Sequence, residues 1–218
     1  MDSNQPTPNA HLVLVFKAPQ RAKSRLRKQL GSETDELATQ LLLCALEDLR
    51  HWPGPATLAA TSAEDADWLA AQKYWPDAPL IQGTGNLGER IANLDLKLRD
   101  QGADRLIFIG SDCPAMDHDY LVKAAEQLDR HDFVLGKAMD GGVSLMGARC
   151  PWPALADLPW STRHLGKALA RRCNTDLRLP PLRDVDDVED LAPLLSELNA
   201  DNRPTRVALK HWLETCLS

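Results

Sequence analysis

An aspartate follows the clearest strand-like run of the sequence. RLIFIG (105–110) has the composition of a buried strand, and the motif GSDCP (110–114) closes it. Small residues around Asp112 let a ligand approach the backbone, and its carboxylate is a hard oxygen ligand of the kind that Mg²⁺ and Mn²⁺ prefer. A lone aspartate can also simply cap a turn. Its place at a strand end favours a divalent cation site.

A basic segment, FKAPQRAKSRLRKQLG (16–31), contains no acid. Its six cations follow the first predicted strand and are Lys17, Arg21, Lys23, Arg25, Arg27 and Lys28. Such side chains beside free backbone N–H groups can neutralise a pyrophosphate. The alternative is a solvated basic start of a helix, which is the usual explanation of a charge run. Because these cations have no acid beside them in the sequence, we expect a loop that binds a small anion.

Two further acidic motifs occur near the predicted ends of strands. In DGGVSLMGA (140–148) two glycines after Asp140 make a tight turn, which is either an ordinary hairpin or a means of placing a carboxylate against a sugar or phosphate. In DVDDVEDL (184–191) the acids precede a helix. Capping is the expected role of Asp187, which leaves Asp186 free to reach a site.

The stretch GTGNLG (83–88) matches the dinucleotide-binding pattern G-x-G-x-x-G. Against this interpretation, the preceding strand is short and includes Pro79, and the next strand-end acid, Asp112, lies further away than the usual spacing of about 20 residues. A dinucleotide site also leaves the basic segment and DGG unused. A dinucleotide-dependent dehydrogenase is therefore a minor alternative.

These motifs need strands and helices to position them. Apolar runs predict strands at 11–16, 56–61, up to Ile81, 105–110, 132–137, 143–148 and, as an extended stretch, 176–180. Helical spacing predicts helices from Ser32 as cap to Trp52, at 63–74 and 87–100, from Asp117 as cap to Arg130, and at 161–173, 187–199 and 205–216, the last packing on the outside. This alternation indicates an α/β fold with a mainly parallel sheet covered on both faces, whose ligands bind beyond the carboxyl ends of the strands.

The bulk composition limits the partners and the compartment. A chain of 218 residues with a formal charge of −6 is not expected to attract nucleic acid or anionic lipid. Five scattered cysteines without a C-x-x-C pair, a polar start and the lack of a long apolar run predict a cytoplasmic protein without a membrane span. We expect a flexible tail over residues 1–10 and a single domain over 11–218.

Taken in order, the motifs resemble a family of bacterial uncharacterised proteins (DUF2064-type) with the GT-A, nucleotide-diphospho-sugar transferase fold. Some members are named as glycosyltransferases associated with arsenosugar biosynthesis. FKAP with KSRL resembles the family's nucleotide loop, and QGTGNLGERI its Q-x-x-G-D-L-G-x-R segment; GSDCP, DFVLG (132–136), DGG, WST (160–162) and DVDDVEDL complete the series. The likeness covers the chain from about His11 to Leu195 and implies a three-layer α/β/α fold with a mainly parallel mixed sheet.

The resemblance also implies roles for particular residues. The phosphates would be contacted by Lys23 and Arg25, with Lys17 nearby. The base or sugar end would be lined by Gln82, Gly83, Asn86 and Arg90. The metal, Mg²⁺ or Mn²⁺, would be bound by Asp112 with Asp186 as a second ligand, and Asp140 would be the catalytic residue that faces the transferred group.

The sequence departs from the family pattern at four places. The loop after Pro19 is short and lacks the usual glycine. Asn86 stands where an aspartate is common, Lys137 replaces a proline, and Val143 replaces the tyrosine after DGG. These changes bear on phosphate binding and on the acceptor pocket.

The activity implied is metal-assisted transfer of a glycosyl group from a nucleotide-diphospho-sugar donor to a small-molecule acceptor. One alternative is a nucleotidyltransferase that joins a nucleoside triphosphate to a small phosphorylated acid or sugar. A second alternative is a degenerate nucleotide-binding protein without turnover. The sequence leaves open the donor, the acceptor, the stereochemistry and whether the chain forms a homodimer.

Overall fold

The computed structural model describes residues 9–217, apart from the side chains of Leu177 and Arg178. Its seven strands form one sheet in the order β3-β2-β1-β4-β6-β5-β7. The strands are β1 (His11–Phe16), β2 (Ala56–Ala60), β3 (Leu80–Ile81), β4 (Leu106–Ile109), β5 (Phe133–Ala138), β6 (Val143–Ala148) and β7 (Leu177–Leu182). β6 pairs antiparallel with β4 and β5, and the other pairings are parallel. The predicted mainly parallel mixed sheet is confirmed.

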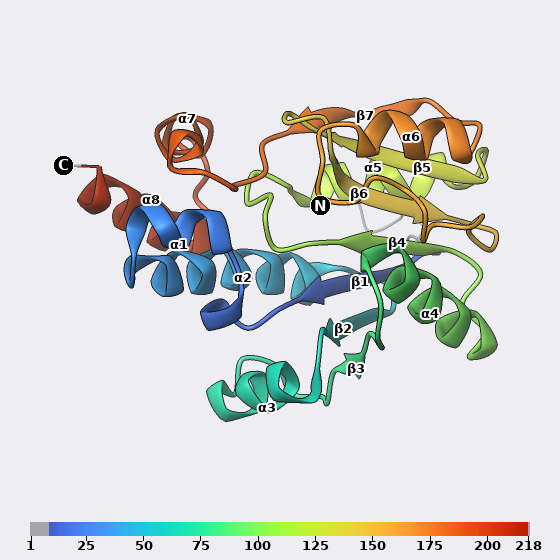
Figure 1. Cartoon of the computed structure of the whole chain (residues 1–218), viewed down its shortest axis with the longest axis horizontal. Coiled ribbons are helices and arrows are strands. Elements are labelled where there is room, and N and C mark those ends of the chain that lie inside the picture. The colour runs from blue at the N-terminus through green and yellow to red at the C-terminus, as the bar shows by residue number, and fades with distance from the viewer. Residues whose placement is uncertain (1–8, 218) are drawn as a thin grey trace.

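Helices connect and cover these strands (Figure 1). They are α1 (Ser24–Leu30), α2 (Glu33–His51), α3 (Ala63–Gln72), α4 (Leu87–Asp100), α5 (His118–Gln127), α6 (Leu165–Arg172), α7 (Leu191–Glu197) and α8 (Pro204–Cys216). Two 3₁₀ turns, η1 (Pro19–Arg21) and η2 (Val188–Asp190), lie before α1 and α7.

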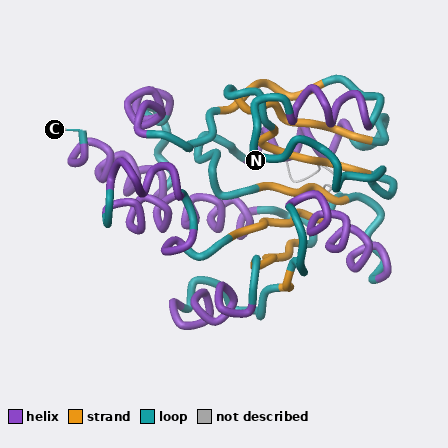
Figure 2. The backbone as a smooth tube through the Cα atoms, viewed as in Figure 1, coloured by secondary structure: helices purple, strands orange, loops and turns teal. Residues whose placement is uncertain are grey.

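The strands separate two apolar cores because successive side chains of a strand point to opposite faces. In β1, Leu12 and Leu14 pack in the core that α2 and α5 cover, whereas Val13 packs in the core that α4 and α6 cover. Figure 2 shows these helices on the two sides of the sheet. A third apolar cluster joins α1, α2, α7 and α8 beyond the sheet. The expected three layers, α/β/α, are confirmed.

Three predictions of local structure were wrong. The basic segment is not all loop, because Ser24–Leu30 forms α1. Ser32 precedes α2 but makes no side-chain capping bond, since α1 ends at Leu30, Gly31 (φ 60°) is its C-cap, and α2 starts almost at once. The helix expected from residue 161 begins only at Leu165, after a turn with Ser161 at φ 60°. The predicted cap at Asp117 is confirmed, because its side chain accepts a hydrogen bond from the Tyr120 amide.

The first eight residues of the predicted tail lie outside the described residues. Further along, Ala10 is buried, and its carbonyl accepts a hydrogen bond from the Trp52 indole. Among residues 9–217 no helix combines the length and apolarity needed to cross a bilayer.

Candidate functional site

A cavity of about 440 Å³ opens where several strands end. Its lining includes residues at or just after the carboxyl ends of β1, β2, β3 and β4 and at the start of the antiparallel β6. This is the edge at which α/β sheets bind ligands. Of the residues predicted to form the site, the lining contains Lys17, Lys23, Arg25, Gln82, Arg90, Asp112 and Asp186, whereas it does not contain Gly83, Asn86 and Asp140.

Lys23 joins the basic segment to two of the acidic motifs. Its Nζ lies 2.6 Å from Oδ1 of Asp112 and 3.4 Å from Oδ1 of Asp186, and it donates a hydrogen bond to the Val185 carbonyl. Only 7% of the side chain is exposed. Burial alone lowers the pKa of Lys23, but the two carboxylates raise it above its usual value. Arg25 reaches the same place, with its Nη2 3.2 Å from Oδ2 of Asp186.

The remaining arginines of the segment also have acidic partners, contrary to the sequence-based argument. Arg21 pairs with Asp65 at 2.6 Å, and Arg27 pairs with Asp35 at 2.6 Å. Neighbouring acids are absent from the segment itself, but the fold brings them from α2 and α3. Repulsion among the cations is therefore no argument for a bound anion. Lys17 is exposed at the cavity.

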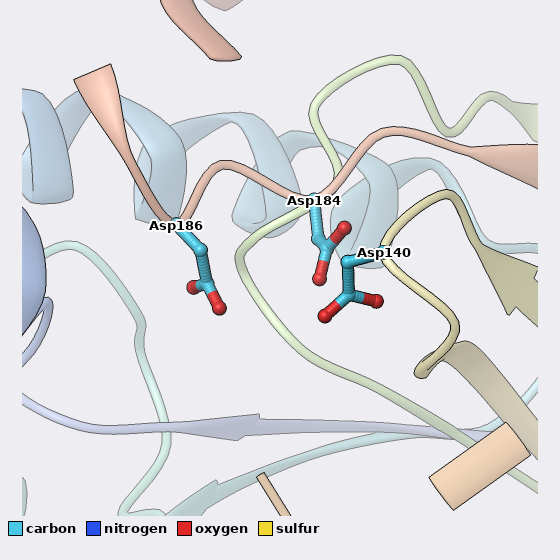
Figure 3. A group of neighbouring side chains, drawn as sticks. All are labelled: Asp140, Asp184 and Asp186. Carbon is cyan, nitrogen blue, oxygen red and sulfur yellow. The ribbon is translucent and has the colours of Figure 1, made fainter. Parts of the chain in front are cut away.

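Three carboxylates meet beside this cavity (Figure 3). Oxygen atoms of Asp140, Asp184 and Asp186 lie within 4.8 Å of one another. Asp140 comes from the β5–β6 turn, and the other two come from the segment after β7. Burial, together with the charge of Asp140, raises the pKa of Asp184 to about 6. We call these three residues the carboxylate trio.

Asp184 was missed as a site residue in the sequence. Capping explains part of the motif DVDDVEDL, so the sequence alone does not single out Asp184. In an extended segment, residues two apart lie on the same side, so the pair Asp184 and Asp186 carried the signal. Asp187 is the N-cap residue of η2, in a capping box with Asp190, so its predicted capping role is confirmed, although the element that it caps is a 3₁₀ turn before α7.

The trio has the chemistry of a divalent cation site. Mg²⁺ and Mn²⁺ prefer carboxylate oxygens, and three such groups at this separation repel one another unless protons or a cation neutralise them. Asp112 is not in the trio and instead contacts Lys23. Asp186 belongs to both arrangements, so it links the Lys23 ion pairs to the trio.

The DGG motif is a hairpin turn that also supports α6. Gly141 has φ 97°, and a Cβ there would lie 2.4 Å from the Arg163 carbonyl oxygen. The Gly166 amide donates a hydrogen bond to the Gly141 carbonyl at 3.0 Å. Asp140 is held by the Gly142 amide, 2.6 Å from its Oδ1. The turn thus places a carboxylate in the trio. The hairpin interpretation of DGG is confirmed, and the placement of Asp140 against a sugar or phosphate stays a prediction.

The glycine-rich stretch mainly builds the start of α4. Asn86 is the N-cap in a capping box with Glu89, and its Nδ2 donates to the Ala156 carbonyl. The side chain of Gln82 is buried, and its Nε2 donates a hydrogen bond to the Ala59 carbonyl at 2.8 Å. Arg90 donates to a backbone carbonyl of the same turn. Asn86 therefore has a structural role that the sequence-based assignment overlooked.

A buried arginine holds the chain that follows Asp112. Arg206 of α8 is 0% exposed and donates to the carbonyls of Pro114 and Met116 at 3.0 and 3.2 Å. Its charge is balanced by Glu47 at 3.0 Å and Asp48 at 2.5 Å, both on α2. The sequence pattern predicted an amphipathic last helix but gave no sign of this buried charge.

Known proteins of the same fold have been solved. A candidate nucleotide-diphospho-sugar transferase from Desulfovibrio desulfuricans G20 superposes with a TM-score of 0.80 at 24% identity, covering 95% of this chain and 97% of its own. A cytidylyltransferase from Leptospira borgpetersenii gives a TM-score of 0.51 at 13% identity, with 96% and 95% covered. A mannosyltransferase from Pyrobaculum calidifontis, solved with GDP-Man and Mn²⁺, gives 0.51 at 11% identity, with 94% and 68% covered. At these identities the likeness establishes the fold.

The sequence comparisons give the family. A search of the curated proteins finds no match. The model of a family described as an uncharacterised protein conserved in bacteria, DUF2064, matches residues 45–162, which is more than half of the chain. The matched part includes Asp112, Asp140 and the WST motif. The chain therefore belongs to the DUF2064 family and has the fold of nucleotide-diphospho-sugar transferases.

Proposed function

We propose that this protein is a divalent-metal-dependent glycosyltransferase that takes its sugar from a nucleotide-diphospho-sugar. One observation carries the proposal: a single cavity has the cations Lys17, Lys23 and Arg25 in its lining and is linked through Asp186 to the carboxylate trio. A diphosphate needs positive charge from side chains or from a metal, and this arrangement offers both kinds of site in one place.

The residues have separate tasks in this reaction. Lys23 and Arg25 bind the diphosphate, and their charges stabilise the negative charge that develops on the leaving nucleoside diphosphate. Asp184 and Asp186 would hold a divalent cation, which would supply further positive charge next to the same leaving group. Asp112 orients Lys23 through their ion pair. Asp140 closes the trio from the β5–β6 turn and faces the transferred group.

Two of the proteins with this fold support the choice of reaction. The candidate transferase of Desulfovibrio desulfuricans superposes over nearly its whole length. The mannosyltransferase of Pyrobaculum calidifontis binds GDP-Man and Mn²⁺. The proposal extends a nucleotide sugar and a divalent cation from those proteins to this chain, where the cavity and the trio offer matching chemistry.

A nucleotidyltransferase is the second candidate. It is favoured by the cytidylyltransferase fold of the Leptospira borgpetersenii protein and by a CMP-sugar synthetase of similar fold solved with CTP, at a TM-score of 0.53. In that reaction the same cations bind a triphosphate, and the product released is pyrophosphate.

Product analysis distinguishes these reactions. The protein is incubated with Mn²⁺ and a panel of nucleotide sugars, or with nucleoside triphosphates and phosphorylated small acids and sugars. Release of a nucleoside diphosphate with transfer to an acceptor supports glycosyl transfer, whereas release of pyrophosphate supports nucleotidyl transfer. Binding without either product supports the degenerate alternative. The variant Asp184→Asn should lose the activity, since it removes a proposed metal ligand.

A further inference from the structure

An indole ring forms part of the cavity wall. Trp160 lines the cavity, is half-buried and packs against the apolar core that α4 and α6 cover. Its Nε1 donates a hydrogen bond to the Leu155 carbonyl at 2.8 Å. The ring is therefore fixed by its polar edge and by core packing, and it also borders the cavity.

The backbone around Trp160 is arranged to bring the ring close to α4. A Cβ at Gly88 would lie 2.5 Å from the Leu155 carbonyl oxygen and 2.6 Å from Trp160 Nε1, so only glycine permits this approach. The Asn86 side chain donates to the Ala156 carbonyl of the same segment at 2.7 Å. Gly88 and Asn86 belong to the G-x-G-x-x-G stretch. This stretch therefore has a structural role: it lets the segment that contains Trp160 pack against α4.

Apolar side chains extend the wall that Trp160 begins. Leu87 and Ile91 of α4, Val143 of β6 and Leu165 of α6 line the same cavity. Leu87 is 39% exposed, although it is a large apolar side chain. None of these four side chains can form a hydrogen bond. The cavity therefore combines a cationic lining with an apolar, partly aromatic one.

We propose that Trp160 is the stacking surface for the base of the bound nucleotide. This inference rests on the proposed function, since it takes a nucleotide as the ligand. A base has flat faces that stack on aromatic rings, whereas a sugar presents hydroxyl groups that need hydrogen-bonding partners. The four neighbouring side chains offer no such partners. Trp160 and the cations of the basic segment line one cavity, so in this proposal the ring contacts the base and the cations contact the phosphates of one ligand.

Two variants test this role by isothermal titration. Trp160→Leu keeps an apolar side chain but removes the stacking surface, and Trp160→Phe keeps an aromatic ring. With a nucleoside diphosphate as probe we expect Trp160→Leu to weaken binding by roughly tenfold or more and Trp160→Phe to retain most of it. Binding of inorganic pyrophosphate, which has no base, should be the same in all three proteins. A common far-ultraviolet circular dichroism spectrum shows that the variants are folded.

Other outcomes would overturn the assignment. Unchanged nucleoside diphosphate binding by Trp160→Leu shows that the ring does not stack on the base. A loss confined to nucleotide sugars shows that it contacts the sugar instead, and equal losses for pyrophosphate and nucleotide show a general structural role. If the wild-type protein binds neither pyrophosphate nor any nucleoside diphosphate, the proposed function fails, and the base assignment fails with it.

Discussion

The Lys23 ammonium nitrogen lies 2.6 Å from a carboxylate oxygen of Asp112, in a position where 7% of the lysine side chain is exposed. The two residues follow neighbouring parallel strands of the sheet, Lys23 after β1 and Asp112 after β4. Lys23 adopts a left-handed backbone conformation, φ 52° and ψ 48°, which is unusual for a residue with a side chain. The ammonium thus places a positive charge next to both Asp112 and Asp186.

This contact gives the variant Lys23→Met two effects of opposite sign. We expect nucleoside diphosphate binding to weaken by about 1–3 kcal/mol, because a charge-assisted contact is lost. Without nucleotide, we expect Mn²⁺ to bind several-fold more tightly, because no ammonium competes for Asp112 and Asp186. Electron paramagnetic resonance of free Mn²⁺ and isothermal titration measure the two affinities. Lys28→Met, an exposed lysine of α1, is the control for charge. If Lys23→Met and Lys28→Met had the same affinities for nucleoside diphosphate and for Mn²⁺, the role of Lys23 would be refuted.

The pKa of Asp184 predicts a pH dependence. Its value in the folded protein, about 6, is above the usual 3.8 because of burial and the charge of Asp140, so the folded state holds this proton more tightly than the unfolded chain. The contribution of Asp184 to the free energy of unfolding therefore falls as the pH rises from about 4 to about 6. We expect Asp184→Asn to stabilise the metal-free protein more at about pH 7.5 than at about pH 4.5.

Urea denaturation at the two pH values measures this difference. Asp67→Asn, an exposed position of α3, is the control. The carboxylate of Asp184 should also make Mn²⁺ binding weaken below about pH 6, because protons and the cation compete for it. A stability difference that does not change with pH would contradict the position of Asp184 in the trio.

The buried ion pairs of α8 should be important for stability. Arg206→Met leaves the buried Glu47 without its cationic partner and leaves Asp48 with Arg203 alone, and removing one member of a buried pair typically costs about 3–5 kcal/mol. Arg172→Met removes a pair with Asp157 that solvent screens, so it should destabilise the protein much less than Arg206→Met. Urea denaturation compares the two. The proposed network is wrong if Arg206→Met is no more destabilising than Arg172→Met.

Gly88 should tolerate no side chain. Gly88→Ala would place a methyl group 2.5 Å from the Leu155 carbonyl oxygen, and we expect it to cost about 1–3 kcal/mol of folding free energy. Gly110→Ala is the matched control, since its nearest neighbouring atom would be 3.8 Å away. Thermal denaturation reveals the difference. Similar stabilities for both variants would show that the 155–160 segment does not pack tightly on α4.

The fold could be predicted from the sequence because its signals are local. β1 and β4 are short apolar runs with clear boundaries, and the apolar residues of α4 recur at helical spacing. The sequence pattern did not predict where some helices begin and end. α1 and α2 are separated by a single turn at Gly31, and α6 begins only after a turn at Ser161. Such joints depend on backbone conformations that the residue types only weakly specify.

The site was predictable in its motifs and less so in its pairings. Lys23, Asp112 and Asp186 each follow a predicted strand, and this position predicted that they lie at one edge of the sheet. In the structure Lys23 contacts both aspartates. The sequence could not show that Asp184 completes a trio with Asp140, because this depends on how the segment after β7 meets the β5–β6 turn. Nor could it show that α8 inserts Arg206 behind Asp112, since this contact joins distant parts of the chain.

The most direct test of the proposed nucleotide and metal site is thermal stabilisation by nucleoside diphosphates, nucleotide sugars, nucleoside triphosphates and NAD(P), each with and without Mn²⁺. Ligands that bind the folded state raise its melting temperature by mass action. We expect a nucleoside diphosphate or its sugar to raise the melting temperature further when Mn²⁺ is present, and this extra rise to be lost in the double variant Asp140→Asn/Asp184→Asn. An undiminished Mn²⁺ effect in that variant, or stabilisation by NAD(P) alone, would contradict the proposed site.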